Sequence, residues 1–480
     1  MIDIAMTIIY NSNIIQTKAK EMKPMKITIF HTNDIHSRLE EFTKIITLLK
    51  DLKTDDDLLL DAGDFHDFMR IEMNGTKGKV GKQLLDYANY DALTVGNNET
   101  FSGITNLEFL AGYGNTKTLS CNIIKNDRTT VNNILPAIIV NKKNINFLII
   151  GISPNINDFS STTGITVLDT TSAITDTLEK YKGHYDFSIA LSHLGYNDDI
   201  TIAKEELGID IIIGGHSHTL MKEALKIKNT IMNQAGNYAE HLGVLELEII
   251  NKEISSYQGK SIAVNDIIED TQALEIIHKA KEEAVKNLSQ PLYHIDEVLF
   301  NDPILENPLT NLICDQLLLQ YPCDFALMHS GICSSGISGD ISKFKLLKLS
   351  PSPLNPTLFK VGGKDLLEAF HQSLDIEKCL HLQKWAGFRG LFLGRLHVSN
   401  NVSILNTDQE LQVLIDQKPL DANQIYTIIS DDFLLRGSGY ESLKNGQLIE
   451  YKGEYIRDTL ELALRNKELI KLAFTTRWFK

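Results

Sequence analysis

Cysteine is scarce in this chain, and the cysteines that are present form no motif. Five occur among 480 residues, namely Cys121, Cys314, Cys323, Cys333 and Cys379, and no two stand at CxxC spacing. A chain of this length can bury a core in each of two domains without covalent help. The cysteine pattern therefore argues against a disulfide framework and a structural zinc site, and it favours buried, reduced thiols.

The sequence also lacks a long hydrophobic run. No stretch of about 18 uninterrupted apolar residues occurs, so no transmembrane helix is predicted. The opening MIDIAMTIIYNSNIIQ is mildly apolar, but Asp3 precedes any Lys or Arg and no small-residue cleavage site follows. We therefore expect a cytoplasmic protein with no membrane partner, and a loosely ordered extension over residues 1–24.

Positive charge is in deficit, with 47 Lys and Arg against 62 Asp and Glu and a formal net charge of −15. The average field repels polyanions, which disfavours nucleic acid as a partner. A small phosphate ester can still bind where divalent cations reverse the field locally. We expect a small-molecule substrate and a monomer or weak dimer.

Short apolar runs alternate with helix-like stretches from residue 26 to about residue 250. The runs are KITIF (26–30), DLLLD (57–61), DALTVG (91–96), INFLIIGIS (145–153), FSIALS (187–192) and IDIIIGG (209–215). The helix-like stretches include Glu40–Leu52, Lys79–Tyr90 and Thr201–Leu207. Strand-like runs that end in polar or glycine-rich sequence, with helices between them, predict an α/β domain.

The pattern changes after residue 265. Apolar residues at helical spacing from Thr271 to Leu288 predict a single exposed, charged helix that joins two domains. Beyond Pro291, a mixture of helix-like and strand-like segments predicts an α+β domain. The expected organisation is an extension over 1–24, a first domain over 25–265, a linker helix over 266–290 and a second domain over 291–480.

Metal-type side chains stand just past the apolar runs of the first domain. They are Asp34, His36, Asp64, Asn97, His193, His216 and His218. In open α/β sheets ligands bind at the carboxyl ends of the strands, because loops from adjacent strands converge there. Carboxylate, amide and imidazole donors suit Mn, Fe or Zn, and no thiolate takes part. Together these residues predict a two-metal site.

Each of these elements has a blander explanation by itself. The pair Asp34 and His36 also fits a capped turn with a surface histidine, and GGHSH also fits a glycine-rich loop. Asp64 also fits a helix cap and Asn97 a turn. The order of all the elements, each directly after an apolar run, favours the metal site.

Several blocks resemble those of a known family. FHTNDIHSRLE, LDAGDF, TVGNNE, LSHLG and GGHSHT resemble, in order and spacing, the signature blocks of calcineurin-like metallophosphoesterases. NPLTNLICD, DFALMHSGICSSGISGDIS and DDFLLRGSGY resemble blocks of the bacterial 5'-nucleotidase and UDP-sugar hydrolase branch. The resemblance implies a four-layer αββα metallophosphoesterase domain, joined by a helix to an α+β 5'-nucleotidase domain that binds the substrate.

The resemblance also implies roles for the metal-type residues. It places one metal on Asp34, His36 and His218, a second on Asn97, His193 and His216, and Asp64 between the two. The expected cofactors are two divalent ions, for which Mn, Zn, Fe and Co are all open. Such a pair activates water for in-line attack on phosphorus. Asp64, as the bridge, and Asn98, beside Asn97 in the sequence, are the residues to which we assign catalytic roles.

The expected activity is the release of phosphate from nucleotides. Two alternatives stay open at this point. One is a phosphodiesterase or pyrophosphatase that acts on cyclic nucleotides or UDP-sugars. The other is a catalytically weak relative that binds nucleotides.

For the substrate, the resemblance implies an aromatic clamp on the nucleobase, with Phe433 and Phe388 as its two rings. Core packing is the alternative for Phe388. Asn355 aligns with an asparagine of the family's binding loop.

The chain departs from the family beside the metals. Asn98 stands where the family has a histidine, and Phe101 stands where an acidic partner is expected. An amide cannot act as a general acid, so we expect Asn98 to donate to a phosphoryl oxygen and turnover to be slow with poor leaving groups. His66 is a possible substitute, but an unrelated surface histidine is the favoured interpretation.

Two further departures concern substrate binding. Ser334 replaces the arginine of the family's NGGGIR block, and Ser438 replaces an acidic residue. Arg389 and Arg436 are the candidates to supply the lost charge-assisted contact to phosphate.

Overall fold

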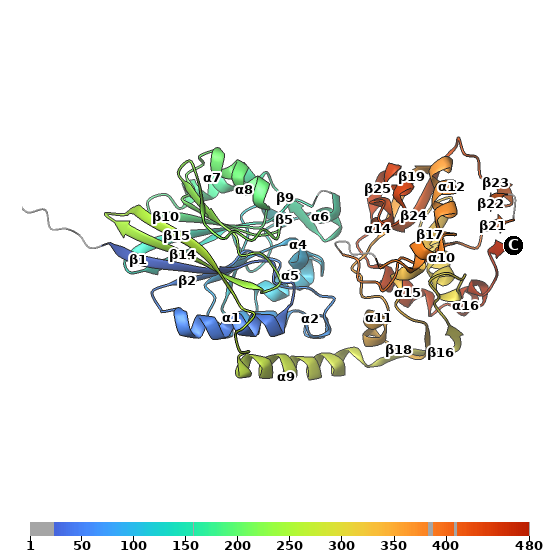
Figure 1. Ribbon diagram of the computed structural model, residues 1–480, viewed down its shortest axis with the longest axis horizontal. Helices are drawn as coiled ribbons and strands as arrows, with labels where there is room; N and C mark the ends of the chain where they lie inside the picture. Colours follow the sequence, from blue (N-terminus) through green and yellow to red (C-terminus); the bar gives the residue numbers. More distant parts are fainter. Residues whose placement is uncertain (1–23, 157, 383–386, 408–409, 480) are drawn as a thin grey trace, which may run out of the picture.

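The computed structural model describes residues 24–156, 158–382, 387–407 and 410–479. Figure 1 shows two bodies joined by one long helix. The predicted extension over residues 1–24 lies outside the described residues, apart from Pro24. None of the helices in the described ranges is long and apolar enough to cross a membrane.

Two sheets build the first body. One has the strand order β15-β14-β1-β2-β3-β4-β6, in which β1, β2, β3, β4 and β6 run parallel. The other has the order β12-β13-β11-β10-β8-β7, in which β13, β11, β10 and β8 run parallel. A short ribbon pairs β5 with β9.

The strands of this body are β1 (Met25–Thr32), β2 (Leu58–Asp61), β3 (Ala92–Thr94), β4 (Lys117–Leu119), β5 (Ile123–Lys125), β6 (Ile134–Leu135), β7 (Ala137–Lys142), β8 (Ile145–Ile152), β9 (Ile165–Val167), β10 (Phe187–Ser192), β11 (Ile211–Gly214), β12 (Leu225–Ile227), β13 (Thr230–Asn233), β14 (His241–Ile250) and β15 (Glu253–Ala263). Its helices are α1 (Leu39–Leu52), α2 (Ile71–Gly75), α3 (Lys79–Tyr87), α4 (Asn97–Thr100), α5 (Ile104–Ala111), α6 (Asp158–Thr162), α7 (Thr170–Lys180) and α8 (Tyr196–Lys204).

The two sheets pack face to face with helices outside them. Ile29 of the first sheet and Ile149 and Ile189 of the second belong to one core cluster between the sheets. α1 packs on the outer face of the first sheet, and α7 and α8 pack on the outer face of the second. The strands are continuously apolar because both faces of each sheet are covered. The predicted four-layer αββα arrangement is confirmed.

Two helices begin or end elsewhere than the sequence predicts. The helix expected over 201–207 is α8, which begins at Tyr196, where acidic residues in the first turn favour a helix start. The helix expected to reach Tyr90 ends at Tyr87, because Asn89 adopts a left-handed φ of 58° that stops the helix.

Helix α9 (Thr271–Leu288) joins the two bodies along the lower edge of Figure 1. The Asp270 carboxylate caps it by accepting the Ala273 N–H at 2.9 Å. Its apolar stripe is buried against α1, α2 and α3. The expectation of an exposed helix is therefore wrong for this stripe, and only the charged face meets solvent.

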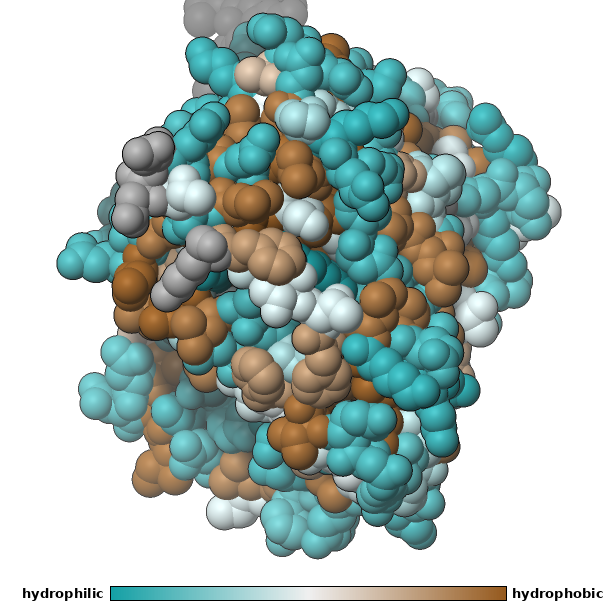
Figure 2. All heavy atoms as spheres, turned by 90° about the vertical axis from the view of Figure 1, so that its right-hand side faces the viewer, coloured by the Kyte–Doolittle hydropathy of each residue, from teal (hydrophilic) through white to brown (hydrophobic). Residues whose placement is uncertain are grey.

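The second body is an α+β domain around one core. Its main sheet has the order β20-β17-β24-β19-β25, a smaller sheet has the order β23-β22-β21-β26, and β16 pairs with β18. Figure 2 views this body from its outer end and shows apolar side chains scattered between polar ones.

The strands are β16 (Pro291–Leu299), β17 (Phe325–His329), β18 (Ile337–Ser342), β19 (Pro356–Gly362), β20 (Leu396–Val398), β21 (Val402–Asn406), β22 (Leu411–Ile415), β23 (Lys418–Pro419), β24 (Ile425–Asp431), β25 (Gln447–Tyr451) and β26 (Trp478–Phe479). The helices are α10 (Pro308–Gln320), α11 (Lys343–Leu349), α12 (Gly363–Gln372), α13 (Ile376–Leu380), α14 (Asp432–Leu435), α15 (Ile456–Ala463) and α16 (Lys467–Ala473).

Candidate metal centre

The loops after parallel strands of both sheets carry the metal-type side chains. The residues, with the strand that each follows, are Asp34 and His36 (β1), Asp64 (β2), Asn97 (β3), His193 (β10), and His216 and His218 (β11). The two sheets face each other, and their parallel strands end at the same edge of the domain. Side chains from distant parts of the sequence therefore gather at one place.

Much of the backbone that carries these side chains is strained. The φ angle is positive at Asp34 (53°), His36 (46°), Asp64 (55°), His216 (70°) and His218 (55°). Side chains other than glycine rarely adopt this conformation, and such outliers cluster at functional sites where surrounding contacts enforce them. Here the Asp34 N–H donates to the Gly63 carbonyl at 2.9 Å, and the His36 N–H donates to the Asp64 carbonyl at 2.8 Å.

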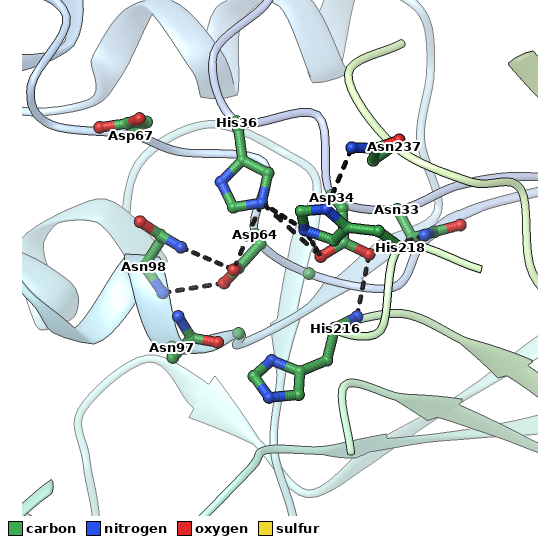
Figure 3. A network of polar contacts seen from close by, with 12 residues as sticks. Asn33, Asp34, His36, Asp64, Asp67, Asn97, Asn98, His216, His218 and Asn237 are labelled. Carbon is green, nitrogen blue, oxygen red and sulfur yellow. Dashed lines mark hydrogen bonds and ion pairs between the residues drawn. The ribbon is translucent and has the colours of Figure 1, made fainter. Parts of the chain in front are cut away.

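Asp34, His36 and His218 form the first cluster of ligand atoms (Figure 3). Asp34 Oδ1 lies 3.4 Å from His218 Nε2 and 3.8 Å from His36 Nε2. The Nε2 atoms of the two histidines are 3.0 Å apart. The other oxygen of Asp34 accepts from the Asn33 amide at 2.7 Å and the His216 N–H at 2.9 Å, which leaves Oδ1 turned to the histidines.

Asp34, Asp64 and His193 form the second cluster. His193 Nε2 lies 3.2 Å from Asp64 Oδ1 and 3.8 Å from Asp34 Oδ1. Asp64 Oδ2 also lies 3.8 Å from His36 Nε2, so Asp64 contacts a histidine of each cluster. Asp34 belongs to both clusters and Asp64 to the second, so the assignment of Asp64 as the bridge stays a prediction.

His216 and Asn97 stand beside these clusters. The His216 ring lies 5.1 Å from the His193 ring, centroid to centroid. Asn97 Oδ1 is buried and has no hydrogen-bond partner among the described residues. Both residues line the same cavity as His36, Asp64 and His218.

The chemistry of this site fits metal ions. Asp34 Oδ1, Asn97 Oδ1 and His193 Nε2 are buried without a hydrogen-bond partner among the described residues, whereas most buried polar atoms have one. His193 Nδ1 donates to the Ala62 carbonyl at 2.6 Å, which orients the ring so that Nε2 points into the site. Oxygen and imidazole donors in this arrangement suit divalent transition metals.

The electric field of the site favours positive charge. Burial lowers the pKa of His193, but the Asp64 and Asp34 carboxylates raise it more, to about 10. Burial raises the pKa of Asp64, but the charge interactions with His193 and His36 and the hydrogen bonds from His193 and Asn98 together outweigh this effect and hold the pKa below its usual range. Burial lowers the pKa of His216, which favours the neutral imidazole that a metal needs.

Glycine lets the loops approach the ligands closely. A Cβ atom on Gly96 would lie 2.2 Å from Asp64 Oδ1. A Cβ atom on Gly215 would lie 2.7 Å from the Ala62 carbonyl oxygen and 2.9 Å from His193 Nδ1. Any larger residue at either position would displace a ligand.

Asn98 holds the Asp64 carboxylate. Its N–H donates to Asp64 Oδ1 at 2.8 Å, and its side-chain amide donates to Asp64 Oδ2 at 2.6 Å. The sequence predicts a bond from this amide to a phosphoryl oxygen, but here the amide hydrogen bond goes to Asp64. Asn98 also lines the cavity.

Glu99 supports the loops from behind, a role that sequence analysis missed. Its buried carboxylate accepts the N–H groups of Asp64 at 3.1 Å, Gly96 at 2.9 Å and His66 at 3.0 Å. His66 Nδ1 lies 3.1 Å from the same carboxylate. The favoured interpretation of His66 as a surface histidine is wrong, because its side chain is fully buried beneath Phe65 and Phe68.

A cavity of about 820 Å³ lies between the two bodies, with the metal-type residues on one side. Asn355, Arg389 and Arg436 of the second body line the other side. The Asn355 amide donates to the carbonyls of Lys452 at 3.1 Å and Glu454 at 2.7 Å, so here it shapes the wall.

The predicted clamp residues lie behind this wall. Phe433 is 0% exposed and Phe388 is 7% exposed, and their rings stack with centroids 4.6 Å apart. Neither is among the residues that line the cavity. In this structure both rings pack in the core of the second body, which is the alternative that the sequence leaves open for Phe388.

Arg389 and Arg436, the arginines predicted to contact phosphate, line the cavity, but each forms an ion pair with a carboxylate. Arg389 pairs with Asp67 across the two bodies, and Arg436 lies 3.0 Å from Asp432. Ser334 donates to the Leu349 carbonyl at 3.1 Å and Ser438 is buried, so neither lines the cavity.

Arg38 is a cavity residue that sequence analysis did not single out. It follows His36 by two positions, is exposed, and lies over the Tyr238 ring at 5.0 Å. Among the described residues its guanidinium has no carboxylate within ion-pair distance. Its only signal in the sequence is its place inside the block FHTNDIHSRLE.

The two bodies of the fold match two known families. Residues 27–220 match the calcineurin-like phosphoesterases, and residues 292–445 match the 5'-nucleotidase C-terminal domain. An uncharacterized metallophosphoesterase of Bacillus subtilis (strain 168), YunD, is 24% identical over 458 residues, which cover 91% of this chain and 98% of that protein. The 5'-nucleotidase of Diplobatis ommata is 25% identical over 499 residues, which cover 88% of this chain and 85% of that protein.

Solved structures share the fold over almost the whole chain. NAD nucleotidase of Haemophilus influenzae has a TM-score of 0.66 at 16% identity, covering 95% of this chain and 100% of that one. The 5'-nucleotidase precursor from Thermus thermophilus has a TM-score of 0.56 at 21% identity, covering 95% of this chain and 97% of that one. The two family matches follow one another as the two bodies do, and the protein is therefore a hydrolase that belongs to the two-domain metallophosphoesterases of the 5'-nucleotidase type.

Proposed function

We propose that the protein releases phosphate from nucleotides with the help of two divalent cations bound beside the cavity between its bodies. The observation that carries this proposal is the convergence of orphaned ligand atoms, namely Asp34 Oδ1, Asn97 Oδ1 and His193 Nε2. These atoms lie beside a cavity of about 820 Å³, a size in the range of small-molecule sites. The family matches support metal-dependent hydrolysis of phosphate esters.

The residues divide into two sets of ligands around a shared carboxylate. Asp34, His36 and His218 would hold one cation, and Asn97, His193 and His216 would hold the other, with Asp64 between them. When bound, the cations supply Lewis-acid stabilisation of the phosphoryl oxygens and lower the pKa of water. The donor atoms leave Mn, Zn, Fe and Co open as the metal.

Arg38 is the residue best placed to bind the phosphate. The family's loop arginine is absent at Ser334, and Arg389 and Arg436 are paired with carboxylates. The Arg38 guanidinium shares the cavity with the ligands His36 and His218. A charge-assisted hydrogen bond from Arg38 would replace the lost contact.

Hydrolysis of a phosphodiester or a pyrophosphate, as in cyclic nucleotides or UDP-sugars, is a second candidate. It is favoured by Arg389 and Arg436, which line the side of the cavity formed by the second body. A second phosphate group there would meet guanidinium groups.

A panel of substrates with metal analysis of the same sample tests both candidates. Purified protein with added Mn would be given nucleoside monophosphates, cyclic nucleotides, UDP-sugars and an aryl phosphate. Released phosphate would be measured for the monoesters, and the nucleoside monophosphate formed from cyclic nucleotides and UDP-sugars would be quantified by chromatography. We expect the highest rate with nucleoside monophosphates. Faster hydrolysis of cyclic nucleotides or UDP-sugars would favour the second candidate, and binding without turnover of any substrate would contradict both.

A further inference from the structure

The position expected for a nucleobase clamp is closed in this structure. Phe388 and Phe433 stack on each other with centroids 4.6 Å apart and an interplanar angle of 22°. His329 packs against both rings, at 5.6 Å from Phe388 and 5.3 Å from Phe433. A base between two rings needs their planes about 7 to 8 Å apart, twice the normal contact distance. This pair has no room for a base.

A different set of aromatic rings lines the cavity itself. Phe101, Phe159 and Tyr451 are all partly exposed cavity residues. Phe101 and Phe159 meet edge to face at 5.4 Å, and Phe159 and Tyr451 meet edge to face at 5.8 Å. A planar ligand ring can stack on the face of a partly exposed aromatic ring that lines a cavity.

This aromatic wall adjoins the metal centre. Phe101 directly follows α4, the helix that begins with Asn97, and its N–H donates to the Asn98 carbonyl at 3.3 Å. Asn98 in turn donates to Asp64. About one turn of helix, roughly 5 Å along its axis, therefore separates Phe101 from Asn97, and Asn98 between them contacts Asp64.

The wall draws on both bodies of the protein. Phe101 and Phe159 come from the first body, directly after α4 and within α6, and Tyr451 ends β25 of the second. A ring bound there would contact residues on each side of the cavity. Phe101 also occupies the position where the sequence departs from the family's acidic residue.

We propose that Phe101, Phe159 and Tyr451 form the subsite for the nucleobase, or for an equivalent planar aromatic group, in place of the Phe388 and Phe433 pair. This proposal rests on the proposed function for the phosphate half of the substrate. Stacking on a ring face reads no hydrogen-bonding pattern, so purines and pyrimidines both fit. The subsite therefore gives a preference for substrates whose leaving group carries a planar aromatic ring, without selecting one base.

A kinetic comparison of ring-bearing and ring-free substrates tests the subsite. The variants are Phe101→Ala and Phe159→Ala, with Phe109→Ala on α5, 39% exposed and outside the cavity, as the matched control. We expect KM for AMP to rise about 10-fold in each of the first two variants, because one stacked base contributes that much affinity. KM for ribose 5-phosphate, which has no ring to stack, stays unchanged, and Phe109→Ala behaves as wild type.

Binding of adenosine to the full chain, measured by calorimetry, separates this proposal from the proposed function because it needs no turnover. We expect Phe101→Ala to weaken adenosine binding about 10-fold and Phe388→Leu, checked for an unchanged melting temperature, to leave it unchanged. The proposal is overturned if Phe101→Ala and Phe159→Ala bind adenosine as wild type does, or if Phe388→Leu alone weakens binding. Failure of the proposed function would instead appear as no phosphate release from AMP or ribose 5-phosphate, with adenosine binding intact.

Discussion

Asn98 donates hydrogen bonds to both oxygens of Asp64, one from its backbone N–H at 2.8 Å and one from its side-chain amide at 2.6 Å. Groups that hold a metal ligand in place commonly change metal affinity or activity when they are replaced. Asn98 thus positions the carboxylate that lies between the two ligand clusters. The family resemblance leads us to expect a histidine with a proton to donate at this position, and in this structure the Asn98 amide contacts Asp64 instead.

Replacing Asn98 with histidine should speed the hydrolysis of poor leaving groups. An imidazolium can protonate the departing alkoxide, which an amide cannot do, and general acid catalysis contributes about 100-fold or more. Because the variant also loses the amide contact to Asp64, we expect a net gain in kcat of about 10-fold on AMP. We expect little gain on p-nitrophenyl phosphate, whose leaving group needs no proton. Asn115→His, at an exposed position, is the control, and equal kcat values on AMP for Asn98→His and wild type would show that no acid is missing.

Gly96→Ala should abolish metal binding while leaving the fold intact. The new Cβ would lie 2.2 Å from Asp64 Oδ1, so the carboxylate has to leave its position. We expect a loss of bound metal and of phosphate release, with an unchanged far-UV circular dichroism spectrum.

The control for this variant is Gly362→Ala in the second body, where φ is −71° and a Cβ meets only Asp365 Oδ2 at 3.1 Å. Normal metal content in Gly96→Ala would show that the two loops can separate without harm to the site.

Arg38→Ala should weaken substrate binding. A charge-assisted hydrogen bond contributes about 1.5 to 3 kcal/mol, so its loss should raise KM for AMP by about 10-fold or more. Arg38→Lys keeps the charge but not the planar fork and should recover part of the loss. Arg465→Ala, outside the cavity, serves as the control, and an unchanged KM in Arg38→Ala would move the phosphate contact to another residue.

The lowered pKa of Lys82 predicts that the stability of the fold depends on pH, and this effect does not involve the candidate metal centre. Burial lowers the pKa of Lys82 from 10.5 to about 8, with Asp86 opposing and Lys117 adding to the shift. The unfolded chain therefore binds more protons between about pH 8 and pH 10.5, and the stability contribution of this group rises with pH across that window. Below pH 8 the buried charge destabilises the fold by up to roughly 3 kcal/mol.

Lys82→Met removes this charge and should raise the melting temperature at pH 7 relative to wild type. The gain is reduced by the lost hydrogen bond from Lys82 Nζ to Thr118 Oγ1, at 3.2 Å, and by the lost bond to the Thr116 carbonyl. Thermal unfolding at pH 7 and pH 10 measures the difference. A gain at pH 10 as large as at pH 7 would contradict the lowered pKa.

The metal-type residues were predictable because their positions follow from local sequence. Asp34 and His36 come directly after an apolar strand, and so do Asp64 and His193. Parallel strands bring such positions to one edge whatever the details of packing. The α/β class of the first body was predictable from its alternating strands and helices, whereas the four layers were expected only from the resemblance to a known family.

The residues that depend on contacts between the two bodies were not predictable. Phe159 and Tyr451 carry no motif, and they meet only because the bodies pack together. The burial of His66 depends on the Glu99 carboxylate, which lies 33 positions away in the sequence. The family resemblance implies that Phe388 and Phe433 form the clamp, but a resemblance in sequence cannot show that their rings close on each other.

The ratio of metal to protein, in wild type and in Asp34→Ala, tests the central claim most directly. Asp34 Oδ1 belongs to both ligand clusters, so its loss should disturb both at once. After loading with Mn and removal of free metal, we expect about two ions per chain in wild type and almost none in Asp34→Ala. A wild-type protein that takes up no transition metal, or an Asp34→Ala variant that binds as much as wild type, would contradict the account.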